Sequence, residues 1–285
     1  MATLFTNQAI LTYNDGQTTL SNIVQGSILD AVTITKTAVN DDYIFGDDVT
    51  YYVSITNNTG SDLTSVSFVD NLGQYPYGAP PVNLYPLTYV GPVLHFRNGA
   101  PQANIVPLTT SPTLTLTIPL IPAGGNVLLV YEVDVNEYAP LDVEDSIENI
   151  VTVSGGGIVE PVTATETIYT SNIPQLAITK NMSPNPVADN STLTYTFILE
   201  NYGNTASTDV VLTDTFDPAL AAGITVTLDG SPLTITTEYT YTAGTGAFAT
   251  ISGVITIPAA TYAQDALGVI TVTPGAAILV VTGTI

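Results

Sequence analysis

The sequence predicts an all-β protein made of two tandem Ig-like β-sandwich domains with an N-terminal donor strand. Short runs rich in Thr, Val, Ile and Tyr alternate with a period of two and end at Asn-Gly, Asp-Gly, Gly-Gly or Pro signals. No segment has a helical period, and part of the first half recurs in the second half. With 285 residues, 45% of them hydrophobic, the chain is long enough to bury two cores.

The two domains are predicted from a repeat with a constant offset of 178 − 34 = 144 residues, over which 34–70 matches 178–214. Many short strands with regular turns are typical of Ig-like sandwiches. The strongest matches are ITKT (34–37) with ITKN (178–181), VTYYVSITN (49–57) with LTYTFILEN (193–201), and VSFVD (66–70) with VVLTD (210–214).

The closing strand of the second domain is out of place. SIENIVTVSGGG (146–157) is predicted to close the first domain, and no equivalent follows the second domain before Ile285. FTNQAILTYNDG (5–16) matches it instead, and the spacing to the next lysine agrees, with 36 − 7 = 29 and 180 − 149 = 31 residues. We therefore divide the chain into a donor strand (1–16), a first domain with its own closing strand (17–158) and a second domain without one (159–285).

A sandwich that lacks its last strand exposes an unpaired edge, which natural proteins cover, and strand addition by another chain is one way to cover it. We expect residues 4–13 of one subunit to complete the second domain of the next, with an inward face of Phe5, Asn7, Ala9, Leu11 and Tyr13. Such a heterologous contact generates a filament. The alternative is that the strand passes the first domain and folds back within its own chain.

Each repeat also places one lysine, one aspartate and one asparagine on a core face, because side chains alternate along a strand. Burying an unpaired ammonium destabilises the fold by several kcal/mol, roughly, unless the group loses its proton. Lys36 and Lys180 are the only lysines, and both take this position. The two predicted sets are Lys36 with Asp70 and Asn149, and Lys180 with Asp214 and Asn7 of a neighbouring subunit.

One reaction explains these sets. A desolvated, neutral lysine amine can attack an asparagine side-chain carbonyl while a protonated aspartate polarises it, and ammonia leaves. The product is an isopeptide bond, within the first domain for Lys36–Asn149 and between subunits for Lys180–Asn7. The alternative is a buried Lys–Asp ion pair capped by an Asn amide, or a lysine that extends to solvent at a strand end.

The charge balance and the absence of cysteine exclude several function classes. Three cations face 25 acids, for a net charge of −22, so nucleic acid and anionic membranes are poor partners and copies of the chain must associate through apolar or backbone contacts. Zero cysteine excludes disulfides, zinc–thiolate sites and cysteine catalysis. No enzyme turnover, metal or cofactor is expected.

Two other candidate sites, the single histidine and the acidic clusters, have simpler structural interpretations. His95 is the only histidine, and we expect an ordinary strand residue there. The acidic pairs Asp41-Asp42 and Asp47-Asp48 and the group within 142–148 could bind calcium. No EF-hand spacing is present, and solvated loop charge is the simpler interpretation.

The expected localisation depends on whether the sequence contains a signal peptide or a membrane-spanning segment. The N-terminus MATLFTNQAILTYNDG has no signal-peptide pattern, and no apolar run is long enough to insert into a membrane. We expect an extracellular, spore-surface or cell-surface protein that leaves by an unusual route or is released by mother-cell lysis.

The motifs ITK, GDDVTYYVSITNNTG and VSFVD, with an asparagine on a closing strand, resemble the conserved-repeat family known as domain of unknown function 11. This resemblance implies Ig-like modules of bacterial and archaeal surface proteins, and the two-repeat form is similar to major subunits of clostridial spore appendages. It also implies Lys–Asn isopeptide bonds at Lys36, Lys180, Asn149 and Asn7. A self-assembling filament subunit is therefore the expected function, and a surface-displayed adhesin or carbohydrate-binding module is the alternative.

Overall fold

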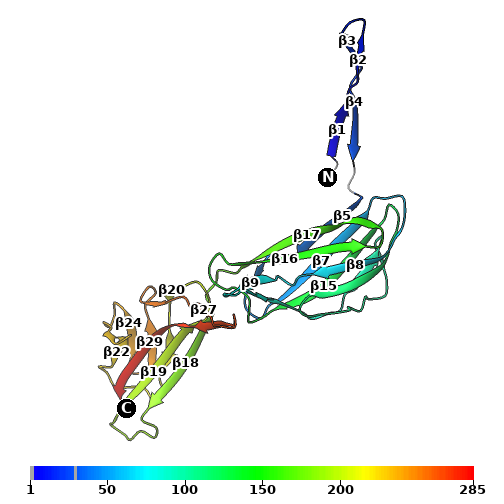
Figure 1. Ribbon diagram of the computed structural model, residues 1–285. Helices are drawn as coiled ribbons and strands as arrows, with labels where there is room; N and C mark the ends of the chain where they lie inside the picture. Colours follow the sequence, from blue (N-terminus) through cyan, green and yellow to red (C-terminus); the bar gives the residue numbers. More distant parts are fainter. Residues whose placement is uncertain (1–2, 29–30) are drawn as a thin grey trace. The chain divides into compact units, whose positions relative to one another are not determined.

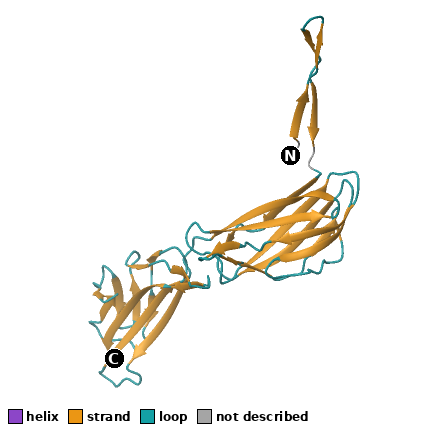
Figure 2. Cartoon of the chain, viewed as in Figure 1, coloured by secondary structure: helices purple, strands orange, loops and turns teal. Residues whose placement is uncertain are grey.

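The computed structural model describes residues 3–28 and 31–285, and every regular element within them is a β-strand (Figures 1 and 2). The predicted all-β fold is confirmed. In the described residues no helix is present that could cross a membrane.

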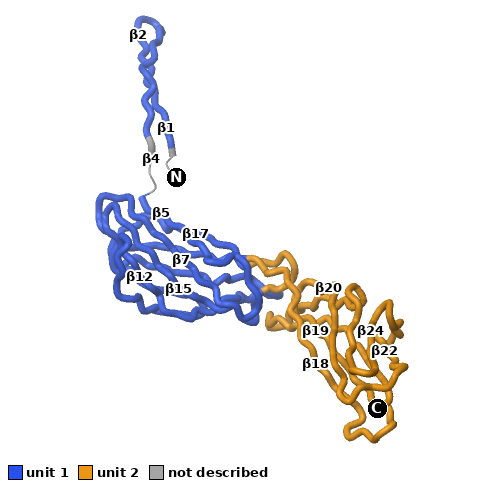
Figure 3. The backbone as a smooth tube through the Cα atoms, turned by 180° about the vertical axis from the view of Figure 1, so that it is seen from behind, with its two compact units in different colours: residues 1–139, 147–168 blue, residues 140–146, 169–285 orange. Residues whose placement is uncertain are grey.

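The chain forms two compact units, which are residues 1–139 with 147–168 and residues 140–146 with 169–285 (Figure 3). The boundary predicted from the sequence lies after residue 158 instead. The difference arises because β17 (Ile158–Thr170) turns back from β16 (Ser146–Gly155) and pairs with it in the same sheet of unit 1.

Unit 1 is a sandwich of two sheets. One sheet has the order β13-β12-β15-β7-β5, with β11 also on β15, and the other has the order β14-β8-β16-β17-β6. The Phe68 ring of one sheet meets the Tyr131 ring of the other edge to face, with centroids 6.2 Å apart. The remaining bounds are β5 (Val32–Ala38), β6 (Asp42–Tyr43), β7 (Asp48–Asn57), β8 (Leu63–Asp70), β11 (Leu87–Tyr89), β12 (Leu94–Arg97), β13 (Ala100–Pro101), β14 (Leu114–Ile121) and β15 (Asn126–Val135), and β9 (Tyr75–Tyr77) pairs with β10 (Val82–Leu84).

Burial follows the predicted alternation in unit 1. Every second residue of β7, β15 and β16 is buried, and so is every second residue of β8 from Val66 to Asp70, so the Thr- and Val-rich runs present one apolar face to the core and one polar face to solvent. On β16 the inward positions are Ile147, Asn149, Val151 and Val153, so Asn149 lies on the core face as the sequence predicts.

Unit 2 has one five-stranded sheet and three small sheets. The five-stranded sheet has the order β18-β19-β29-β22-β23, and β20-β26, β21-β25-β24 and β27-β28 form small separate sheets. Its core includes the stacked rings of Tyr195 and Phe216, 4.8 Å apart. The bounds are β18 (Leu176–Ser183), β19 (Thr192–Asn201), β20 (Ser207–Val210), β21 (Thr213–Thr215), β22 (Thr225–Leu228), β23 (Ser231–Pro232), β24 (Tyr239–Thr242), β25 (Ala247–Thr250), β26 (Ile255–Ile257), β27 (Thr261–Gln264), β28 (Ile270–Thr273) and β29 (Gly275–Thr284).

The N-terminal segment is a β-hairpin. β1 (Thr3–Asn7) pairs with β4 (Val24–Ile28), and β2 (Ile10–Tyr13) pairs with β3 (Gln17–Leu20). These are the only pairings of β1 and β2 in the described chain, so neither strand pairs with unit 2 of its own subunit. The segment that the sequence assigns to one strand up to residue 16 is therefore half of a two-stranded element (Figure 1).

Candidate functional site

Lys36 and Asp70 form an ion pair inside unit 1. Lys36 projects inward from β5 and Asp70 from the end of β8 in the facing sheet, and Lys36 Nζ donates to Asp70 Oδ2 over 2.5 Å. Neither side chain is exposed to solvent. Burial lowers the pKa of Lys36, and the charge of Asp70 opposes that shift only in part. The amine is therefore displaced toward its neutral, nucleophilic form.

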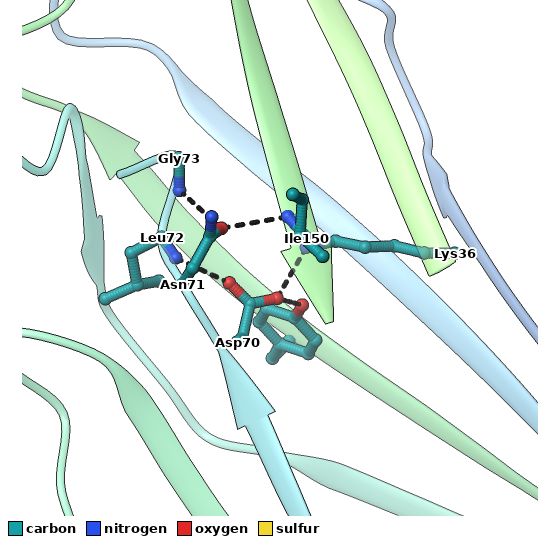
Figure 4. A network of polar contacts seen from close by, with 7 residues as sticks. Lys36, Asp70, Asn71, Leu72, Gly73 and Ile150 are labelled. Atoms are coloured by element: carbon teal, nitrogen blue, oxygen red, sulfur yellow. Dashed lines mark hydrogen bonds and ion pairs between the residues drawn. The ribbon is translucent and has the colours of Figure 1, made fainter. Parts of the chain in front are cut away.

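Hydrogen bonds hold the aspartate and the closing strand in place (Figure 4). The amide of Leu72 donates to Asp70 Oδ1 over 2.8 Å. Asn71 Oδ1 accepts the amide of Ile150 over 2.8 Å and that of Gly73 over 3.1 Å. Because Ile150 directly follows Asn149, the Asn71 side chain fixes β16 at the position from which Asn149 enters the core.

Asn149 is fully buried, and neither its Oδ1 nor its Nδ2 has a hydrogen-bond partner. Leaving such a group unsatisfied costs about 1–3 kcal/mol. Asn149 lies two residues from Val151, the Cα partner of Asp70 across the β16–β8 pair. A buried, unpartnered carboxamide therefore lies next to the buried Lys–Asp pair, which is unusual for a native core.

Tyr51 adjoins both the amine and the carboxamide. Lys36 Nζ is 4.6 Å from the centre of the Tyr51 ring. Burial raises the pKa of the Tyr51 hydroxyl, and the adjoining Asn149 side chain offsets part of the rise. The hydroxyl and the carboxamide adjoin without completing a hydrogen bond of ordinary geometry. Lys36 and Asn149 thus both adjoin the same aromatic side chain.

A second tyrosine acts on the aspartate. The Tyr131 hydroxyl donates to Asp70 Oδ2, the same oxygen that Lys36 contacts, and burial raises the pKa of Tyr131 well above its ordinary value. Sequence reasoning missed both tyrosines. The repeat held a signal for Tyr51, because Tyr195 takes its place at the 144-residue offset. It held none for Tyr131, because Tyr131 on β15 is the Cα partner of Tyr51, whereas the Cα partner of Tyr195 on β29 is Val281.

The arrangement can support the predicted condensation. The Lys36 amine would attack Asn149 Cγ, forming a C–N bond, and the bond from Cγ to Nδ2 would break. Asp70 would polarise the carbonyl as an acid and carry one amine proton to the leaving nitrogen, which departs as ammonia. No oxidant, metal or cofactor enters this balance.

Unit 2 repeats the Lys–Asp contact without covering it. Lys180 Nζ donates to Asp214 Oδ2 over 2.5 Å, as in unit 1, but 41% of the Lys180 side chain and 18% of the Asp214 side chain are exposed. The Lys180 ammonium lies 4.7 Å from the ring centre of Tyr195 and 5.5 Å from that of Phe216. The second site therefore has its charged pair and its aromatic wall, and it is open to solvent.

The opening lies where unit 1 has its closing strand. In unit 1, β8 pairs with β14 on one side and with β16 on the other. In the described part of the chain, the counterparts β20 and β21 pair on one side only, with β26 and β25. An apolar groove of about 320 Å³ lies there, and its lining includes Leu176, Ile178, Val211 and Leu212. Ile178 is 61% exposed, although its counterpart at the 144-residue offset, Ile34, is partly buried.

The structure thus brings together Lys36, Asp70 and Asn149 in unit 1 and Lys180 with Asp214 in unit 2. Asn7 pairs with Val24 in the hairpin, and no described residue occupies the Asn149 position of unit 2. Of the predicted donor face, Phe5 is 49% exposed, Leu11 63% and Tyr13 44%.

The remaining candidates have local roles. His95 is buried on β12, and that burial lowers its pKa. Two acidic residues cap their own loops, since Asp47 accepts the amide of Ile44 over 3.0 Å and Asp145 accepts that of Asp142 over 2.8 Å. Across residues 3–28 and 31–285, no three His, Cys, Asp or Glu side chains converge in a way that could hold a metal ion.

No protein-family model and no curated protein sequence matches this chain. Solved structures do. The major pilin subunit BcpA of Bacillus cereus is 13% identical, with 95% of this chain and 73% of that chain covered and a TM-score of 0.36. Domains D2 and D3 of the major pilin SpaD of Corynebacterium diphtheriae are 14% identical, with coverages of 85% and 88% and a TM-score of 0.36. The collagen-binding domain of a Staphylococcus aureus adhesin is 13% identical, with coverages of 50% and 99% and a TM-score of 0.29.

Proposed function

We propose that this chain is a structural subunit that polymerises head to tail into an extracellular or spore-surface filament. The N-terminal strand of one subunit completes unit 2 of the next, and Lys–Asn bonds lock the assembly. One observation carries the proposal: unit 2 has the Lys–Asp contact of unit 1, at the same 2.5 Å, beside a strand edge that lacks the partner it has in unit 1.

Unit 1 supplies the expected register of the junction. There, Val151 lies opposite Asp70 and Val153 opposite Phe68. With Asn7 at the position of Asn149, Ala9 lies opposite Asp214 and Leu11 opposite Leu212. Leu11 and Phe5 then cover the apolar groove, and Asn7 arrives beside Lys180.

The energetics suit a chain that carries a net charge of −22. Two copies repel each other at long range, so the contact must rest on short-range terms. Strand addition supplies backbone hydrogen bonds along β20 and β21, together with burial of Phe5 and Leu11. The covalent bond then makes the junction irreversible, and no turnover or cofactor is required.

The proposal predicts that the face of the donor strand decides assembly. Replacing Phe5 and Leu11 together with Asp should abolish filaments in electron micrographs, because two carboxylates would have to enter the groove of unit 2. The matched control replaces Thr6 and Thr12 with Asp, which adds the same charge to the same strands on the opposite face, and should still assemble. Filaments from the Phe5/Leu11 variant equal to those of the wild type would contradict the proposal.

A further inference from the structure

We propose that the donor is the whole N-terminal hairpin, residues 3–28, and that β3 and β4 take the place in the neighbour's unit 2 that β17 has in unit 1. This inference rests on the proposed function and extends it from one donated strand to two. Each unit would then be closed by a two-stranded element. Unit 1 uses its own β16–β17 hairpin, and unit 2 uses the hairpin of the next subunit.

The turns of the two hairpins each contain three successive residues with positive φ. Asn14, Asp15 and Gly16 have φ angles of 41°, 61° and 102°, and Gly155, Gly156 and Gly157 have 69°, 63° and 104°. Three successive residues with positive φ are rare, because only glycine, and to a lesser degree Asn and Asp, tolerates this region. The same turn follows a matching strand in both places.

The two hairpins also hold the same place in the chain. Each begins with the strand that carries the asparagine position, β1 or β16, and each is followed along the chain by the strand that carries the lysine, β5 or β18. The turn is one residue further from Asn7 than its counterpart is from Asn149, since 14 − 7 = 7 and 155 − 149 = 6. At the break between β1 and β2 the sum of paired residue numbers falls from 31 to 30, so the hairpin has one extra residue on its β3–β4 side there.

In unit 1, β17 makes contacts that the closing strand β16 alone does not make. It pairs with β16 on one side and with β6 on the other. Ile168 is fully buried, and Glu166 Oε1 accepts the backbone amide of Ala38 on β5 over 3.1 Å. β17 therefore protects the outer edge of the closing strand and ties it to the start of the domain.

Among the described residues, no strand of unit 2 takes the place of β16 or of β17. The counterparts of β6 are residues 42 + 144 = 186 and 43 + 144 = 187, and Val187 packs partly buried against the unit 2 core. A single donated strand would leave its own outer edge unpaired next to this segment, whereas a donated hairpin arrives with β3 and β4 already on that edge.

Both strands of the hairpin carry exposed apolar side chains. On the second strand and its connection, Leu20 is 59% exposed, Ile23 60% and Val24 54%. A hairpin of two strands is marginally stable in water unless it packs on another element. Apolar side chains on both strands indicate that the hairpin docks as a unit.

The test exchanges the second strand in the full-length chain. In one variant, residues 17–28 become a Gly/Ser segment of the same length, so that the donor strand and its tether remain. In the matched variant, the same residues become the twelve residues of 158–169 from β17. Assembly is measured by electron microscopy and by the fraction of protein that sediments as polymer.

We expect the Gly/Ser variant to lose at least about tenfold in polymer, and the β17 variant to assemble like the wild type. Wild-type assembly by the Gly/Ser variant, together with loss in the Phe5/Leu11 variant, would overturn the hairpin and leave the donated strand intact. Wild-type assembly by both of those variants would overturn the proposed function as well. Failure of the Gly/Ser and β17 variants alike would overturn the equivalence of β3–β4 with β17.

Discussion

Replacing Asn149 with Ala is expected to lower the melting temperature of unit 1 by about 15 °C. The variant cannot form the Lys36–Asn149 bond, which joins residues 149 − 36 = 113 positions apart. By analogy with a disulfide, a cross-link that closes a loop of this length stabilises a domain by about 4–5 kcal/mol, chiefly by restricting the unfolded chain. Differential scanning calorimetry of the full-length chain measures the change.

The sign of this effect separates the two interpretations of the site. If Asn149 merely capped an ion pair, its removal would relieve a buried carboxamide that has no hydrogen-bond partner, and the protein would lose little stability or gain some. If the bond forms, the loss of the cross-link outweighs that relief. A melting temperature unchanged or raised by Asn149→Ala would therefore refute the bond.

Intact mass provides the control. The wild-type monomer should weigh less than its sequence by the mass of one ammonia molecule, and the Asn149→Ala variant should have its full mass. Asp70→Asn keeps the size of the side chain and removes the acid that carries the proton, so it too should keep the ammonia. A wild-type chain of full mass would contradict the proposal without any reference to stability.

Period-two alternation was sufficient to place three groups of the first site on core faces. Lys36, Asp70 and Asn149 are all buried, because a strand in a sandwich alternates between core and solvent over its whole length. The phase of the repeat likewise located the open edge of unit 2, since the match depends on side-chain pattern rather than on tertiary contact.

The sequence could not predict what depends on pairing between distant segments. The sequence does not indicate that residues 3–13 pair with residues 17–28, where at the break Ser21 Oγ accepts the amide of Ala9 over 2.9 Å and Gln8 Nε2 donates to the Ser21 carbonyl over 2.8 Å. These bonds join the two strands at the break between β1 and β2. The sequence also could not identify Tyr131 as a contact of Asp70, because its inward position on a strand is the same as that of the apolar residues around it.

The second large effect concerns the junction between subunits. Wild-type filaments boiled in denaturant should run as a ladder of covalent oligomers, whereas filaments of Asn7→Ala should collapse to monomer. Asn7→Ala retains Phe5 and Leu11, so it should still assemble, and only the resistance to boiling should be lost. Lys180→Ala should behave in the same way, because it removes the other partner of the same bond.

Mixing the two single variants shows whether the bond joins different subunits. Each covalent junction needs Asn7 from the donor and Lys180 from the acceptor. A Lys180→Ala subunit can donate Asn7 to an Asn7→Ala subunit, but neither end of that pair can react again. The boiled mixture should therefore contain covalent dimers and no longer ladder. A bond within one chain would give only monomers, and a purely non-covalent junction would make the wild type collapse too, so the dimer band is specific to donation between subunits.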